Sequence, residues 1–276
     1  MAGTFTAACL QITSRREVED TLADVSDLVR RTRDGGADLI LTPENTGFMA
    51  QGRKNLMARV EFEHENRPLA AYRALAAETG AWLLIGSLSV RLEDDERVAN
   101  RSYLLDTAGD VVAKYDKIHM FDVDLGNGES YRESNGFRPG DRAVVADLPW
   151  GRLGLSVCYD LRFPQLYRAL AHAGADFLSI PSAFTRQTGR AHWHTLLQAR
   201  AIETGCFVFA PAQCGEHEDG RKTYGHSLIV APWGEVLADG GEETGIVSAE
   251  IDPARVAEAR GRLNALGHDR DFAPPA

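Results

Sequence analysis

The chain has 276 residues, a formal net charge of −10 at pH 7 and 44% hydrophobic residues. This length suits one large α/β domain or two small ones, and the hydrophobic fraction can fill a sizeable core. The acidic balance argues against a nucleic-acid-binding surface, which needs a basic face. No stretch approaches the roughly 18–20 uninterrupted apolar residues of a membrane span, so neither nucleic acid nor a membrane is an expected partner.

The cysteine pattern and the N-terminal residues indicate a reducing compartment. The cysteines form no C-x-x-C pair and no zinc-finger spacing; they are Cys9, Cys158, Cys206 and Cys214. The N-terminal residues lack the basic and apolar regions of a signal peptide. We therefore expect reduced thiols and a cytoplasmic location.

Strand-like and helix-like segments alternate through the first half of the chain. Short apolar runs predict strands, and apolar residues at helical spacing predict helices. Gly35 and Gly36 end the first helix, and Gly80 is the expected C-terminal cap of the second. The expected elements are a strand over 5–12, a helix over 18–33, a strand over 38–42, a helix over 69–79, a strand over 82–90 and a hairpin of 100–105 with 110–115.

The second half repeats this alternation. The expected elements are a strand over 153–157, a helix over 165–173, a strand over 176–180, a helix over 192–203, strands over 206–210, 227–231 and 246–250, and a helix over 253–263. A loop near the site is expected over 120–135, and a mobile or partner-packed tail over 269–276. Alternation without a linker or repeat predicts a layered α/β sandwich formed by one domain, residues 1–276.

One cysteine stands at a corner where chemistry in α/β folds commonly occurs. Cys158 follows the apolar run 153–157, and Pro164 can open the next helix because its missing N–H is harmless there. Backbone N–H groups and the positive end of a helix dipole would favour a thiolate, and an oxyanion beside it. For this residue alone, a small buried core cysteine is an equally good interpretation.

Glu44 and Lys117, like Cys158, follow predicted strands. Ligands in open α/β sheets gather beyond the carboxyl ends of strands, so these three side chains could converge. Each charged residue alone would more often be a solvated surface group. Together, an acid, an ammonium and a thiol at strand ends favour a catalytic site.

These residues lie in motifs that resemble those of the nitrilase superfamily of carbon–nitrogen hydrolases. The motifs are Pro43-Glu44, Tyr115-Asp116-Lys117-Ile118-His119 and Gly154-x-x-x-Cys158-Tyr159-Asp160-x-Arg162-Phe163-Pro164, within a resemblance that runs from about residue 5 to 270. The resemblance implies a catalytic triad of Glu44, Lys117 and Cys158, with a second glutamate at Glu133. It also implies an α-β-β-α sandwich that pairs into a four-layer homodimer.

Further runs look most like the Nit-type amidases, the branch that contains deaminated-glutathione amidase and ω-amidase. They include Pro181-Ser182-Ala183-Phe184, Thr188-Gly189-Arg190-Ala191-His192-Trp193 and Tyr224-Gly225-His226-Ser227. Two residues depart from the pattern: Gln165, where Glu often follows Arg-Phe-Pro, and Arg190, at a variable site. The resemblance implies that the terminal amide of a small anionic metabolite is hydrolysed to a carboxylate and ammonia without a cofactor.

The residue types support this chemistry independently. A thiol attacks an amide carbonyl well only if a neighbour removes its proton or lowers its pKa. Glu44 can take that proton and later give one to the departing ammonia. Lys117 and the backbone N–H of Tyr159 can hold the tetrahedral oxyanion. Water would then attack the thioester, with Glu44 or Glu133 as the base.

Candidate substrate-binding residues follow from charge and position. The cations nearest the motifs are Arg162, Arg186 and Arg190, and one of Arg186 or Arg190 could grip a substrate carboxylate bidentately. Exposed surface arginines are the alternative interpretation. Tyr159 and Phe184 are candidates for the pocket wall, although aromatic residues more often fill the core.

No metal or nucleotide cofactor is expected. His192 and His194 lie two residues apart, do not share a helix face and have no evident third ligand. His226 is expected to be a structural hydrogen-bonding residue. The sequence contains neither the G-x-x-x-x-G-K-[ST] nor the G-x-G-x-x-G phosphate-binding pattern.

Other functions remain open at this point. N-carbamoyl hydrolysis and nitrile hydrolysis occur in the same superfamily, and a panel of amides, ureido acids and nitriles would separate them. A binding protein with a vestigial site is a further alternative. The intact Glu44, Lys117 and Cys158 count against it.

Overall fold

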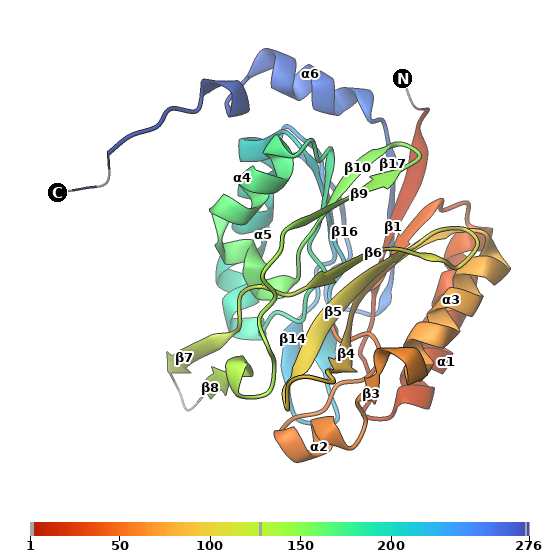
Figure 1. The fold of residues 1–276 in the computed structure, drawn as a ribbon. Coiled ribbons are helices and arrows are strands. Elements are labelled where there is room, and N and C mark those ends of the chain that lie inside the picture. The colour runs from red at the N-terminus through yellow and green to blue at the C-terminus, as the bar shows by residue number, and fades with distance from the viewer. Residues whose placement is uncertain (1–2, 127–128, 274, 276) are drawn as a thin grey trace.

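Two β-sheets face each other, and helices cover the outer face of each sheet (Figure 1). The computed structural model describes residues 3–126, 129–273 and 275. This arrangement confirms the predicted α-β-β-α sandwich. No helix in the described part of the chain is long and apolar enough to cross a membrane.

The first sheet carries helices α1 (Val18–Asp34) and α3 (Arg67–Thr79) on its outer face. Its strands are, in spatial order, β17 (Gly245–Ile251), β1 (Phe5–Gln11), β2 (Leu39–Leu41), β4 (Trp82–Arg91), β5 (Val98–Leu105) and β6 (Val111–Asp116), with β3 (Glu61–Phe62) beside β4. β1, β2 and β4 run parallel to one another, as expected for strands joined by crossover helices.

The second sheet carries helices α4 (Pro164–His172) and α5 (Arg186–Thr204) on its outer face (Figure 1). Its strands are, in spatial order, β16 (Val236–Asp239), β15 (Leu228–Val230), β12 (Phe207–Ala210), β11 (Phe177–Ser179), β10 (Gly151–Leu155) and β9 (Val144–Leu148). Here β10, β11 and β12 are parallel.

Apolar side chains from both sheets share one core. Leu41 and Leu84 of the first sheet belong to the same buried cluster as Leu155, Phe177 and Val208 of the second. Short strands such as β2 are buried along their whole length, which explains why their sequences are continuous apolar runs. The facing sheets therefore hold the ends of their strands in fixed relative positions.

Helices α3 and α5 begin and end at capping residues. The Asn66 side chain accepts a hydrogen bond from the Leu69 N–H at the start of α3, and Gly80 ends that helix in the left-handed conformation, as predicted. Thr185 caps α5 in the same way through the Thr188 N–H. Because of this cap, α5 begins at Arg186, whereas the sequence predicted a start at 192.

The segment over 120–135 is more ordered than the predicted loop. It contains the hairpin strands β7 (Asp122–Gly126) and β8 (Glu129–Arg132), followed by a 3₁₀ turn, Glu133–Asn135. The prediction of a loop was wrong because the strands are short and polar, but the segment does lie near the site. Elements that the sequence did not predict are α2 (Arg53–Met57), β13 (Cys214–Glu216), β14 (Lys222–Tyr224), and β3, β9 and β16.

After α6 (Ala254–Arg262) the chain passes α4, and only its last described residues extend away from the body of the molecule (Figure 1). Asp269 is bound to α4, where it accepts hydrogen bonds from Arg168 and His172. Phe272 beyond it is 88% exposed. Packing of this tail on a partner remains a prediction.

Candidate active site

The ends of three strands bring Glu44, Lys117 and Cys158 to the wall of one cavity of about 330 Å³. Glu44 follows β2, Lys117 follows β6 and Cys158 follows β10. The Lys117 ammonium lies 2.9 Å from a Glu44 carboxylate oxygen and 2.9 Å from the Glu133 carboxylate. The structure thus collects all four residues that the sequence singled out for catalysis.

Cys158 adopts a backbone conformation that most residues avoid. Its φ angle is +51°, and its N–H donates to the Pro181 carbonyl at 2.9 Å. A non-glycine residue in this left-handed region costs of order 1 kcal/mol or more, and such strain persists only where the surrounding structure holds it. The sharp corner starts the 3₁₀ turn Cys158–Arg162, which leads directly into α4 at Pro164.

A buried carboxylate holds this corner in place. Asp160 accepts hydrogen bonds from the Val157 N–H at 2.9 Å and from the Tyr115 hydroxyl at 2.6 Å. Its other oxygen accepts from the His119 N–H and lies 2.7 Å from His119 Nδ1. Asp160 therefore ties the cysteine corner to the segment that carries Lys117.

Glu44 is 3% exposed, and both of its carboxylate oxygens accept hydrogen bonds. One carboxylate oxygen accepts from Lys117 and from Asn100 Nδ2 at 2.9 Å, and the other accepts from the Ala183 N–H at 2.9 Å. Burial would raise the pKa of Glu44, but the charge of Lys117 and hydrogen bonds from Cys158, Lys117 and Asn100 hold it below the usual value. Glu44 therefore rests as a carboxylate and can accept a proton.

Lys117 stands between two carboxylates. Its side chain is 1% exposed, and burial alone would lower its pKa. The charges of Glu133 and Glu44 outweigh burial and raise the pKa well above the usual value. Lys117 is therefore a fixed positive charge at the cavity wall.

The Cys158 thiol differs from the sequence-based expectation of a stabilised thiolate. Burial raises its pKa well above the usual value, and the charge of Glu44 raises it further against the opposing effect of Lys117. The resting sulfur therefore keeps its proton, and attack requires Glu44 to remove it as attack occurs.

A family model described as carbon-nitrogen hydrolase matches residues 6–261 of the chain. The chain belongs to the carbon–nitrogen hydrolase family. Its membership confirms the motif-based prediction of a nitrilase-superfamily enzyme.

Individual relatives agree with this assignment. Deaminated glutathione amidase from Yersinia enterocolitica is 38% identical over 266 residues, which cover 95% of this chain and 92% of that protein. The crystal structure of the C. elegans NitFhit protein matches with a TM-score of 0.90 and 36% identity, over 98% of this chain and 66% of that chain. A glutamate-to-glutamine variant of an amidase from Nesterenkonia sp. AN1 carries acrylamide added to its active-site cysteine; it is 28% identical, with a TM-score of 0.78, over 94% of this chain and 98% of that chain.

The cavity of this carbon–nitrogen hydrolase is lined by some of the predicted substrate-binding residues. Tyr159, Arg162 and Phe184 lie in its wall, and the Arg162 guanidinium lies over the Phe184 ring, 5.3 Å from the centroid. Arg186 and Arg190 lie on the first turns of α5 and are not among the described residues that line the cavity. The structure thus does not support either as the carboxylate-binding residue, because α5 begins earlier than predicted and carries both away from the wall.

Several site residues were not predicted. The Asn100 side-chain amide donates to both Glu44 and Glu133, and its Oδ1 is buried without a donor in the described part of the chain. The Gln213 side chain donates to the Glu44 carbonyl at 2.9 Å. Asn100 is followed in its strand by an arginine and a serine, which are also polar, so no local pattern assigned it to the site. Gln213 likewise carries no local signal that it contacts Glu44.

Proposed function

We propose that this carbon–nitrogen hydrolase is a cofactor-free, thiol-dependent amidase that acts on the amide of a small anionic metabolite. One observation carries the proposal: Cys158, Glu44 and Lys117 surround the same small cavity, with Glu44 ionised and Lys117 charged. A volume of about 330 Å³ suits a small substrate. The test of this proposal is to incubate the protein with a panel of amides and to measure the release of carboxylate and amine.

In the acylation step, the Cys158 sulfur attacks the amide carbonyl carbon while Glu44 takes the thiol proton. The carbonyl oxygen becomes an oxyanion, which Lys117 and the Tyr159 backbone N–H stabilise. The Cys158 N–H is already used by the Pro181 carbonyl, so it is not the donor. Glu44 then returns the proton to the leaving nitrogen, the C–N bond breaks, and a thioester on Cys158 remains.

In the deacylation step, water attacks the thioester carbonyl and displaces the Cys158 sulfur. A carboxylate must accept the proton from that water and return it to the departing sulfur. Glu44 can do both, and Glu133, whose oxygens lie 2.9 Å from Lys117, is the second candidate for the water proton. The products are a carboxylate and the regenerated thiol.

The substrate proposal rests on the relatives called deaminated glutathione amidase. Deaminated glutathione and α-keto acid amides are both small and anionic. A primary amide releases ammonia, whereas deaminated glutathione would release the amine of cysteinylglycine, so an assay for ammonia alone would miss that reaction. Carbon dioxide release from ureido acids would point instead to an N-carbamoyl hydrolase.

Two cavity arginines are available to bind a substrate carboxylate. Within the described residues, Arg162 and Arg221 form no ion pair with a carboxylate, and Arg221 Nε is buried without an acceptor. The other two arginines in the wall are paired: Arg53 with Glu96 and Arg132 with Asp124. We assign the carboxylate to Arg162 and Arg221.

Arg162→Met is expected to raise KM for an anionic amide by about tenfold or more, because a charge-assisted hydrogen bond contributes about 1.5–3 kcal/mol. The KM of an uncharged amide of similar size should change by less than about threefold. Steady-state kinetics on both substrates, with Arg221→Met in parallel, provide the measurement. Arg190→Met is the control, and equal effects of Arg162→Met and Arg190→Met would overturn the assignment.

We also propose a homodimer that uses an exposed apolar patch, here called the Trp233 patch. It consists of Ile202 on α5, 50% exposed, and Trp233 before β16, 50% exposed. Ile202 lies against Gly234, and the Arg262 guanidinium of α6 lies over the Trp233 ring. Large exposed apolar residues that adjoin one another are typical of interfaces.

At about 10 µM protein, sedimentation equilibrium is expected to give twice the mass of one chain, because a stable apolar interface would keep the dimer together at this concentration. Trp233→Glu should shift the protein towards the monomer, because it places a charge in that interface. Val112→Glu, at a 45% exposed residue of β6, is the matched control and should remain dimeric. A monomeric wild-type protein at this concentration would contradict the proposal.

The free cysteines support a cytoplasmic location. All four thiols are buried and none forms a disulfide. A reducing compartment would also keep the Cys158 sulfur available for catalysis.

A further inference from the structure

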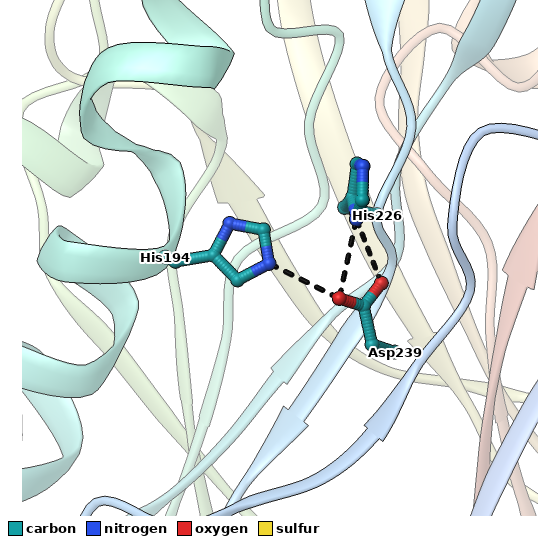
Figure 2. A group of neighbouring side chains, drawn as sticks. All are labelled: His194, His226 and Asp239. Carbon is teal, nitrogen blue, oxygen red and sulfur yellow. Dashed lines mark hydrogen bonds and ion pairs between the residues drawn. The ribbon is translucent and has the colours of Figure 1, made fainter.

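Three possible metal ligands meet on the surface, outside the cavity wall (Figure 2). They are His194 on α5, His226 between β14 and β15, and Asp239 at the end of β16. One ligand atom of each lies within 4.8 Å of the others. Among residues 3–126, 129–273 and 275, no other group of histidine, cysteine and acidic side chains meets in this way.

The spacing of the three ligand atoms fits a metal ion. His194 Nε2 lies 3.1 Å from Asp239 Oδ2, and His226 Nδ1 lies 3.2 Å from the same oxygen. In a tetrahedral zinc site with bonds of about 2.0–2.1 Å, neighbouring ligand atoms are about 3.3–3.4 Å apart. An ion could therefore be bound by these side chains with small movements.

His226 is held in position by its backbone. Its φ angle is +54°, in the left-handed region, and its N–H donates to the Gly241 carbonyl at 2.6 Å. Its carbonyl accepts from the indole of the buried Trp193 at 2.7 Å, and its ring stacks on Tyr224 with centroids 4.5 Å apart. A strained backbone held by this many contacts fixes the direction of the ring.

Asp239 is also oriented before any ion binds. Its Oδ1 accepts from the Gly241 N–H at 2.9 Å and lies 2.9 Å from His226 Nδ1, while Oδ2 lies 3.1 Å from His194 Nε2 and 3.2 Å from His226 Nδ1. Burial opposes ionisation, but hydrogen bonds from Gly241, His194 and His226 hold the pKa of Asp239 below its usual value. A hydrogen bond to the other oxygen of a ligating carboxylate is typical of metal sites.

The site is open to solvent. The side chains of His194, His226 and Asp239 are 34%, 21% and 35% exposed. Two imidazoles and one carboxylate suit a divalent transition ion rather than calcium or magnesium, which prefer oxygen ligands. From the sequence, His194 was considered only with His192 and no metal was expected, because the partners His226 and Asp239 lie far along the chain.

We propose that His194, His226 and Asp239 form a binding site for a divalent transition-metal ion such as Zn²⁺, with water completing the coordination. A bound ion would join α5 to β16 and to the segment before β15. It would therefore stabilise the outer layer of the second sheet without entering the catalytic cavity.

The test is zinc binding by the full-length protein without a polyhistidine tag, in a Cys158→Ala background that removes the cavity thiol as a competing ligand. Competition with a chromophoric chelator is expected to give one Zn²⁺ per chain with a Kd of about 10 µM or tighter. Zinc at about a hundred times Kd should raise the melting temperature by roughly 5 °C or more. Both effects should weaken at least tenfold, or vanish, in His194→Gln, which alters an accessible helix residue.

Asp239→Asn and His226→Asn extend the test, since asparagine tolerates the left-handed backbone at 226. The control is His172→Gln, because His172 also pairs with a single carboxylate, that of Asp269. It should bind zinc as the parent does. The proposal would be overturned if no saturable binding occurred up to about 1 mM Zn²⁺, or if the parent and His194→Gln bound zinc with equal affinity. The three side chains would then form a hydrogen-bonded cluster and no metal site.

Discussion

Cys158→Ala is expected to lower kcat/KM for the best amide substrate by at least about 10⁴-fold, because no other group can form the acyl intermediate. The fold should be kept, since the side chain is small and the corner is held by Asp160 through the Val157 N–H and the Tyr115 hydroxyl. Steady-state amine or ammonia release, with circular dichroism as a check of folding, provides the measurement.

Cys9→Ala is the matched control for this loss. Cys9 is also a buried free thiol, but it lies within β1 and is not among the described residues that line the cavity. Its replacement should change kcat/KM by less than about threefold. Substantial turnover by folded Cys158→Ala would contradict the thioester mechanism.

Lys117→Met is expected to damage both catalysis and stability. It removes an oxyanion donor, which typically costs about 10²–10³-fold in rate. It also leaves the buried Glu44 carboxylate and the partly buried Glu133 carboxylate without their shared cation. Breaking a buried ion pair in this way typically lowers the free energy of unfolding by about 3–5 kcal/mol. Kinetics and urea unfolding measure the two effects separately.

Lys114→Met, three residues earlier and on β6, is the control. Lys114 is 47% exposed and pairs with Glu63 at the surface, so its loss should cost less than about 1 kcal/mol and leave activity intact. The double variant Lys117→Met/Glu133→Gln removes one of the unpaired charges, so it should recover part of the stability and none of the activity. Full activity in Lys117→Met would exclude the oxyanion role.

The site residues that directly follow a strand could be predicted from the sequence. Glu44, Lys117 and Cys158 each follow a strand that is readable from its sequence, and parallel strands in facing sheets bring such ends together. The C-terminal cap of α3 was readable for a similar local reason, because Gly80 decides where that helix ends.

Features set by distant contacts could not be predicted. The pKa of Cys158 rises because the cavity buries the thiol beside Glu44, and neither effect is visible in the residues around Cys158. Arg221 reaches the cavity from a turn that no local pattern connects to the site. In each case the deciding partner lies far along the chain.

The proposed mechanism requires a covalent bond between the substrate and Cys158, and intact-mass spectrometry after rapid acid quenching tests it most directly. With enzyme in excess over a small primary amide, the protein mass should rise by the mass of the amide less that of ammonia. The added acyl group should map to Cys158 and disappear as the carboxylate forms. An adduct on another residue, or carboxylate formation by the Cys158→Ala variant at the wild-type rate, would contradict the account.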